Sequence, residues 1–279
     1  MQSEQSADDG RVAYERHGEG QSLVLLHGGM APREYWTPVL PHLEGYAAVV
    51  PQRPGFGTCL DDPDETPSGE VLVREAEYVR ALVEAVDGDP ILFGHSFGAL
   101  TAIEAARDAA VEAVVAYEPA VLPDDFRAEA DLAARMDALL EAGERREAVK
   151  RYVEQVLHPE GIEDLDGWLA EWPVWPDCVD LAEEVVRMNR AVERYRLPDR
   201  LDVDAPVLVM TGTEGPEFLR ESARAVHEAL PHSRLVEFDG VSHSGPGEAP
   251  ETVSAEMDAF LRHRTSVVDT AVGSSERRR

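Results

Sequence analysis

The segment Gly94-His-Ser-Phe-Gly98 sets a serine between two glycines, directly after the short apolar run Ile91-Leu-Phe93. Such a run is typical of a strand, and the pattern from Ala99 onward is typical of a helix. In this context G-x-S-x-G forms a nucleophile elbow, a sharp, strained turn that holds the serine Oγ away from the backbone. The glycines remove Cβ atoms that would collide there. The motif predicts that Ser96 is a nucleophile; the alternative is an ordinary turn serine.

A serine hydroxyl is a weak nucleophile and needs a base, an acid that orients the base, and donors for the oxyanion. In this architecture the base follows the serine and the acid along the chain. His243, in Gly240-Val-Ser-His243 after the last predicted strand, meets this requirement. His95 is expected to pack within the elbow. The other candidates lie at positions more typical of surface residues: His158, His227, His232 and His263.

The first long apolar run ends in His27-Gly-Gly-Met30. Glycine lets the backbone approach a substrate carbonyl closely, so the N–H groups of Gly29 and Phe97 are candidate oxyanion donors. Met30, the next residue, is a candidate substrate contact. The alternative is an ordinary glycine-rich strand end.

Strand and helix patterns alternate along the chain, which predicts an α/β fold with a mostly parallel sheet and helices on both faces. The expected strands are 11–17, 22–27, 47–50, 91–93, 113–117, 206–210 and 234–238, and the expected helices are 32–43, 69–86, 99–110, 217–230 and 250–262. We expect the core to comprise 11–120 and 204–263, with disordered ends at 1–10 and 264–279.

Residues 121–203 break this alternation, because their apolar residues recur at helical spacing with no strand pattern between them. We interpret this interval as a helical lid over the carboxyl edge of the sheet. Trp168, Trp172 and Trp175 recur near helical spacing within it. They either line an apolar acyl pocket, as candidate substrate contacts, or fill the lid's own core.

Composition excludes several classes of partner. The chain has 279 residues, 55 acidic against 26 basic, and a net charge of −29. Such a surface repels nucleic acid and anionic membranes, so neither is an expected partner. Acidity of this kind also resembles proteins that work in molar salt, a halophilic habitat in which self-repulsion is screened. We expect a small-molecule substrate; the oligomeric state is not predicted.

Targeting and cofactor signals are also missing from the sequence. We expect one soluble, cytoplasmic domain, because no apolar stretch is long enough to cross a bilayer and residues 1–10 do not resemble a signal peptide. Cys59 and Cys178 are too few and too far apart in sequence for a disulfide framework or a metal knuckle. No metal or nucleotide motif is present, so no cofactor is expected.

Taken together, the motifs make the chain resemble the α/β-hydrolase fold enzymes over roughly residues 11–263. The matching segments occur in the family's order: His27-Gly28-Gly29, Arg53-Pro-Gly-Phe-Gly57, Gly94-His-Ser-Phe-Gly98 and Gly240-Val-Ser-His243. The resemblance implies an eight-stranded, mostly parallel sheet. Its early strands are expected to be shortened or lost, since nothing before Arg11 has a strand pattern.

The acid departs from the family pattern. The resemblance implies an Asp shortly after the strand at Pro206–Met210, but Gly215 stands at that place and Glu214 is one residue early. Glu118, at the end of the strand before the lid, is the second candidate, because one group of haloalkane dehalogenases carries its acid there. We favour Glu118, since Pro119 restricts the turn that aims it. Either glutamate is otherwise a solvated or salt-bridged loop acid.

A serine nucleophile predicts acyl transfer, whereas the family's usual dehalogenation and epoxide opening need a carboxylate. With no basic cluster to hold an anion, the expected substrate is a small, largely apolar, uncharged ester or lactone, cleaved through an acyl-enzyme. The same residues also serve carbon–carbon bond hydrolysis and cofactor-free peroxidation. A non-catalytic binding protein on this fold is the remaining alternative.

Overall fold

An eight-stranded sheet organises the molecule in a computed structural model that describes residues 3–6, 12–31, 33–51, 53, 70–128, 130–158, 161–172 and 175–275. The strand order is β1-β2-β4-β3-β5-β6-β7-β8. Strand β2 runs antiparallel to both neighbours, and the remaining pairs are parallel. The strands are β1 Ser3–Ser6, β2 Ala13–His17, β3 Gln21–Leu26, β4 Tyr46–Pro51, β5 Ile91–His95, β6 Ala113–Tyr117, β7 Val207–Gly212 and β8 Ser233–Phe238.

Both faces of the sheet are covered, which explains why its central strands are continuously apolar. Side chains alternate between faces: in β3, Val24 and Leu26 join one apolar cluster, and Leu23 and Leu25 join another. The first cluster includes α1 Val71–Ala85, α2 Phe97–Ala106 and α8 Glu217–Ala229. The second includes the 3-10 helices η1 Arg33–Trp36 and η2 Leu40–His42 and the helix α10 Pro250–Ser275.

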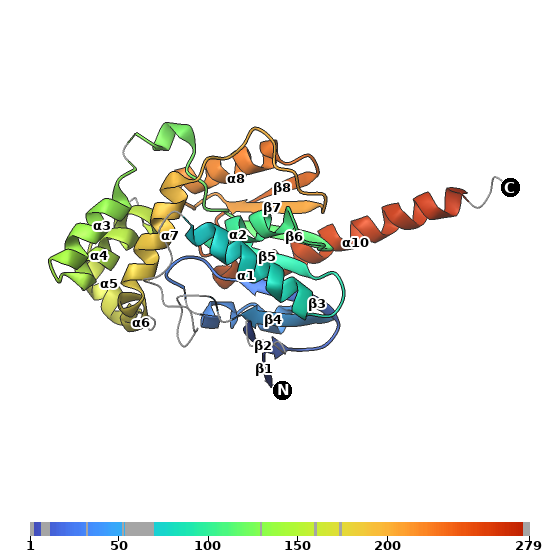
Figure 1. Ribbon diagram of the computed structural model, residues 1–279, viewed down its shortest axis with the longest axis horizontal. Helices are drawn as coiled ribbons and strands as arrows, with labels where there is room; N and C mark the ends of the chain where they lie inside the picture. The colour runs from blue at the N-terminus through green and yellow to red at the C-terminus, as the bar shows by residue number, and fades with distance from the viewer. Residues whose placement is uncertain are drawn as a thin grey trace.

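The interval between β6 and β7 is helical in every element that the described residues form there. It contains η4 Asp124–Phe126, α3 Leu132–Glu141, α4 Arg145–Tyr152, the π-helix η5 Val153–Leu157, α5 Leu165–Glu171, α6 Trp175–Asp180 and α7 Ala182–Arg194. We call α3 to α7 the insertion. Its helices gather at one side of the sheet (Figure 1). They share an apolar cluster to which the core contributes Met30, Phe97 and Ala120.

Three local expectations are corrected. Residues 3–6 form β1 instead of lying in a disordered N-terminus, so the sheet has all eight strands. The sequence of β1 is polar and has no strand pattern of its own. Its pairing with β2 therefore supplies the order. Residues 264–275 continue α10 instead of a disordered tail, because extending a packed helix costs less than starting one. The single helix expected at 32–43 is instead two 3-10 turns, since Pro38 and Pro41 lack backbone donors.

None of the described helices combines the length and apolar character that crossing a bilayer requires.

A series of ion pairs, buried except for a partly exposed Arg74, joins the core to the insertion. Arg53, just after β4, donates from Nε to Glu75 Oε2 of α1 at 2.9 Å, and both side chains are fully buried. Arg74 Nη2 lies 3.1 Å from the other Glu75 oxygen and 2.8 Å from Glu184 Oε1 of α7. Arg187 Nη2 donates to the second Glu184 oxygen at 2.5 Å. Because charges removed from water need partners, this series of ion pairs links the end of β4 to α1 and α7.

Replacing Glu75 with Gln should lower the free energy of unfolding by about 3–5 kcal/mol, because the buried Arg53 guanidinium loses its countercharge. Denaturant unfolding would measure the change. The control is Asp202→Asn, which breaks the exposed 2.9 Å pair between Arg200 and Asp202 and should cost at most about 1 kcal/mol. Equal losses in the two variants would contradict the expected role of the buried pair.

Candidate active site

Ser96 occupies a strained turn between β5 and α2. Its φ is 55° and its ψ −120°, in the region that favours glycine. Such a conformation costs about 1–3 kcal/mol and persists where the surroundings fix it. Here the Ser96 N–H donates to Tyr117 O at 2.9 Å, and its carbonyl accepts from Ala120 N at 3.1 Å. The serine turn is therefore tied on both sides to the end of β6.

Two further strained turns surround it. Among the described residues other than glycine, positive φ occurs at Met30, Ser96 and Glu118. Each follows a strand, respectively β3, β5 and β6, and these three strands are adjacent in the sheet. All three turns therefore lie at one carboxyl edge. Clustered strain of this kind is a feature of functional sites, where the packed scaffold holds it in place.

The structure brings His243 and Glu118 into direct contact. His243 lies between β8 and α9 Gly245–Glu248, and its Nδ1 is 2.5 Å from Glu118 Oε2. The other carboxylate oxygen accepts from Thr211 Oγ1 at 2.7 Å and from Gly212 N at 3.2 Å. Because the carboxylate accepts at Nδ1, the imidazole has Nε2 left to take a proton. Glu118 is fully buried, and its oxygens are satisfied by these donors.

Glu214 lies apart from this pair. Its side chain is exposed, with Thr213 Oγ1 at 3.5 Å from its Oε1. Gly215, at the position where the family pattern has its acid, packs against Glu118: a Cβ added there would overlap Oε1 and lie 3.1 Å from Cδ. The missing side chain at 215 therefore makes room for the carboxylate supplied by β6.

Two residues, His95 and Tyr117, bind the backbone of the loop that carries His243. His95 Nε2 is 2.9 Å from the His243 carbonyl oxygen, and the two rings lie 4.5 Å apart. Tyr117 donates its hydroxyl to the Ser242 carbonyl at 2.6 Å. Burial, with the nearby His243, lowers the pKa of His95, so a neutral ring serves as the donor. Sequence reasoning missed Tyr117; its only signal was a hydroxyl at the end of an otherwise apolar strand.

Ser96 and His243 lie at the same edge of the sheet, and their side chains form no direct hydrogen bond. His95 precedes Ser96 in the chain and bonds the His243 backbone. The Ser96 hydroxyl makes no hydrogen bond to any described residue, although the side chain is only 4% exposed. In unliganded sites such bonds are often long and tighten when substrate binds.

The predicted oxyanion residues flank the serine. Phe97 begins α2, whose first N–H groups have no partner within the helix. A Cβ on Gly28 would lie 3.0 Å from Ser96 Cβ, so the turn after β3 lies directly against Ser96. Arg53 Nη1 donates to the His27 carbonyl and steadies this turn. Burial, followed by the Arg53 charge, lowers the pKa of His27 and keeps it neutral.

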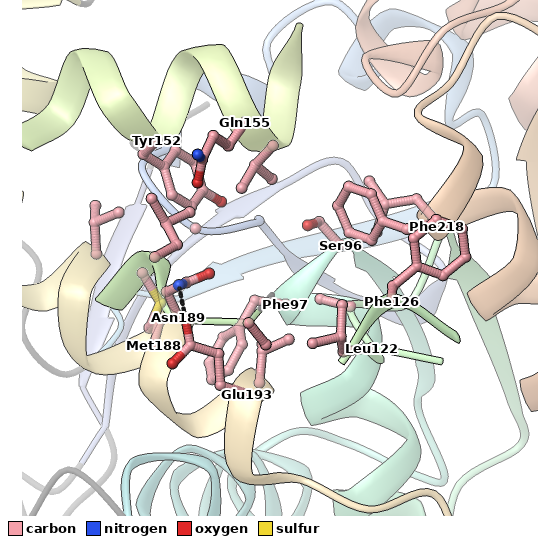
Figure 2. A pocket seen from close by; sticks show the side chains of 18 of the residues that line it. Ser96, Phe97, Leu122, Phe126, Tyr152, Gln155, Met188, Asn189, Glu193 and Phe218 are labelled. Atoms are coloured by element: carbon pink, nitrogen blue, oxygen red, sulfur yellow. Dashed lines mark hydrogen bonds between the residues drawn. The ribbon is translucent and has the colours of Figure 1, made fainter. Parts of the chain in front are cut away.

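A cavity of about 350 Å³ opens over Gly29, Ser96 and Phe97. Figure 2 shows Ser96 on one side of it, with residues of the insertion opposite. Its apolar wall includes Leu122, Phe126, Leu132, Val185, Met188 and Phe218. A smaller polar part carries Arg135, Glu154, Gln155, Asn189 and Glu193. An apolar cavity with a few polar groups is typical of a small-molecule site.

Four candidate substrate contacts lie outside the cavity wall, and for the three tryptophans the structure favours the alternative role in the core of the insertion. Met30 and Trp175 are buried in the apolar cluster of the insertion, and Trp168 and Trp172 pack against it. None of these four side chains is part of the cavity wall described above. Trp168 and Trp172 instead contact each other at 5.2 Å between ring centroids. Their bulk stabilises the insertion, and smaller apolar side chains form the wall.

Within the described part of the chain, no three His, Cys, Asp or Glu side chains are grouped so as to hold a metal ion. Cys178 is buried, donates from Sγ to Met30 O at 3.2 Å, and has its pKa raised to about 12, mainly by burial. It is a structural thiol. Cys59 and residues 54–57 of the Arg53 motif lie outside the described residues.

Comparison with known proteins gives independent evidence for the fold class. Residues 23–256 match the model of the alpha/beta hydrolase family. An (E)-2-((N-methylformamido)methylene)succinate hydrolase from Acinetobacter baylyi is 24% identical over 275 residues, 89% of this chain and 93% of that protein.

Two solved structures are similar at lower identity. The esterase RhEst1 from Rhodococcus sp. ECU1013 has a TM-score of 0.67 at 20% identity, covering 94% of this chain and 98% of its own. The 2-hydroxy-6-oxo-6-phenylhexa-2,4-dienoate hydrolase BphD from Rhodococcus sp. strain RHA1 has a TM-score of 0.69 at 16% identity, covering 94% and 99%. The predicted fold class is confirmed.

Replacing Glu118 with Gln should slow the labelling of Ser96 by a fluorophosphonate on the order of 10³- to 10⁴-fold, because the imidazole loses the group that orients it. Glu214→Gln is the matched control and should label at the rate of the unmodified protein. Mass spectrometry of the labelled peptide would measure both rates. The reverse order of effects would assign the acid to Glu214.

Proposed function

The chain belongs to the alpha/beta hydrolase family, and we propose that it is a serine hydrolase that cleaves a small, largely apolar, uncharged ester or lactone. One observation carries the proposal: the strained Ser96 turn and the His243–Glu118 pair share one edge of the sheet, beneath an apolar cavity. The apolar lining of this cavity and its lack of an unpaired cation among the described residues support a neutral, apolar substrate.

The proposed reaction begins with attack of Ser96 Oγ on the substrate carbonyl carbon. His243 Nε2 takes the hydroxyl proton, and the carbonyl oxygen becomes an oxyanion that accepts from the N–H groups of Gly29 and Phe97. As the tetrahedral intermediate collapses, the imidazolium returns the proton to the leaving oxygen. Water, deprotonated by the same imidazole, then hydrolyses the acyl-enzyme. Glu118 keeps its hydrogen bond to His243 Nδ1 throughout and stabilises the imidazolium.

The charges of the cavity support a neutral substrate. Its one arginine, Arg135, is already 2.6 Å from Asp131 and 3.0 Å from Gln155. Glu193 accepts from Ala133 N at 2.9 Å and from Asn189 Nδ2 at 3.0 Å, and burial raises its pKa. A carboxylate substrate would meet these acidic groups with no unpaired cation among the described lining. The succinate and dienoate named for the two hydrolase relatives are anionic, so we do not transfer their substrates to this chain.

A pair of matched esters tests the substrate class. 4-Nitrophenyl hexanoate should be hydrolysed at least about tenfold faster, in kcat/KM, than the mono-4-nitrophenyl ester of adipic acid, since about 1.4 kcal/mol of charge repulsion is enough for that ratio. Ser96→Ala should reduce turnover of the hexanoate about 10⁶-fold, to background. Equal rates for the two esters would contradict the proposed charge preference. Turnover of neutral diketones but not of esters would favour carbon–carbon bond hydrolysis by the same residues.

Activity should fall as the pH is lowered from about 8 to about 5, because a protonated imidazole cannot act as the base. The measurement is kcat/KM of the hexanoate across this range, with His232→Gln, at an exposed turn, as the control with an unchanged profile. A flat profile in the unmodified enzyme would argue against His243.

Far-ultraviolet circular dichroism should accompany this profile. Burial lowers the pKa of His27 and His95, so below about pH 6.5 the unfolded chain binds their protons more readily than the folded chain. Stability therefore decreases as the pH falls, and the activity data count only where the fold persists.

A further inference from the structure

We propose that the hydroxyl of Tyr152, a residue of the insertion, is a third oxyanion donor beside the N–H groups of Gly29 and Phe97. The inference rests on the proposed serine hydrolase function and adds a catalytic residue to it. Tyr152 ends α4, where the chain passes into the π-helix η5. Its neighbours Gln155 and Val156 face the same cavity.

The position of the hydroxyl carries the argument. A Cβ built on Gly29 would lie 3.1 Å from Tyr152 Oη and 3.4 Å from Met188 Cε. The hydroxyl therefore lies within contact distance of Gly29, whose N–H is a proposed oxyanion donor. Figure 2 shows the ring entering the cavity from the insertion, with its hydroxyl directed toward the interior that Ser96 borders. Glycine at 29 keeps this space open.

The Tyr152 hydroxyl also has no structural hydrogen bond among the described residues. Tyr152 is 7% exposed and belongs to the apolar cluster of the insertion, yet its hydroxyl makes no hydrogen bond to any described residue. Buried hydroxyls normally have partners, so one left open on a cavity wall is available to a ligand. Several other buried or half-buried tyrosines do have partners: Tyr46 bonds Asp258 at 2.8 Å, Tyr117 bonds Ser242 and Tyr195 bonds Glu104.

The chemistry of this phenol suits an oxyanion donor. Burial, together with the neighbouring Cys178, raises the pKa of Tyr152, so the group keeps its proton at neutral pH. A neutral donor adds no charge to the resting cavity and gains most when negative charge develops on the substrate oxygen. Cys178 also binds the Met30 carbonyl, which holds the Gly29 turn beneath the hydroxyl. In this proposal the insertion supplies an oxyanion donor as well as part of the cavity wall.

The test compares Tyr152→Phe with Tyr46→Phe, a control whose hydroxyl bonds Asp258 on α10 and does not line the cavity. Tyr152→Phe should lower kcat for 4-nitrophenyl hexanoate about 10²-fold with little change in KM. Its inhibition constant for an alkyl trifluoromethyl ketone, which forms an oxyanion on Ser96, should rise by a similar factor. Its inhibition constant for the matching alkyl ether, which has no carbonyl, should stay the same. Tyr46→Phe should match the unmodified enzyme in all three.

Two results would overturn the proposal while leaving the hydrolase function intact: unchanged kcat and ketone affinity in Tyr152→Phe, or an equal loss of ketone and ether affinity, which indicates packing alone. A crystal structure of the unmodified enzyme with the ketone adduct gives an independent measurement. Tyr152 Oη should lie within about 3.2 Å of the adduct oxygen, and a separation too long for a hydrogen bond would overturn the proposal even if the variant failed to fold. Absence of both ester turnover and fluorophosphonate labelling in the unmodified protein would overturn the proposed function and this inference together.

Discussion

The buried carboxylate of Glu118 is the constraint on which the site depends. An ionised carboxylate taken out of water is costly unless hydrogen bonds replace its hydration. The fold meets this requirement from two other strands: β7 ends in Thr211 and Gly212, which bond one oxygen, and the loop after β8 delivers His243 to the other. Glu118 therefore fixes the orientation of the His243 ring and also ties together the carboxyl ends of three neighbouring strands.

Strain at this edge depends on the stiffness of the sheet. Backbone turns with positive φ at Met30, Ser96 and Glu118 would relax in an isolated peptide, because each costs about 1–3 kcal/mol. Here each turn follows a central strand with both faces buried. Hydrogen bonds between the turns, such as Ser96 N–H to Tyr117 O, connect them directly. The core thus holds three strained backbone positions in conformations that they would not keep alone.

The sequence was informative where the chemistry is local. The G-x-S-x-G turn needs a strand, a helix and two glycines within a short segment, so Ser96 and its elbow could be located from the residues alone, and the α/β fold class followed from alternation. The choice between Glu118 and Glu214 depends on packing between β6 and β7, which no single segment records. The clue was Gly215, a missing side chain whose meaning appears only once Glu118 is seen to fill the space.

The sequence left two roles open for the tryptophans of the insertion. Three tryptophans near helical spacing resemble a pocket lining, but large rings are also what a small group of helices needs to build a core of its own, and here they do that. Polar strand β1 and the end of α10 were missed for a related reason: their order comes from a neighbouring strand or an already packed helix, and neither leaves a periodic pattern in the segment itself.

The insertion is joined to the core by two physically different contacts, and this decides how it can contribute to the site. Met30, Phe97 and Ala120 of the core enter its apolar cluster beside the cavity, while Arg74 and Glu184 connect α1 and α7 through a partly buried ion pair. Apolar contacts tolerate small shifts, whereas an ion pair largely removed from water depends on good geometry to offset its desolvation. The pair therefore holds α7 in register, and with it Met188 of the cavity wall. We therefore infer that an insertion held in this way selects substrates through the shape and charge of a preformed wall.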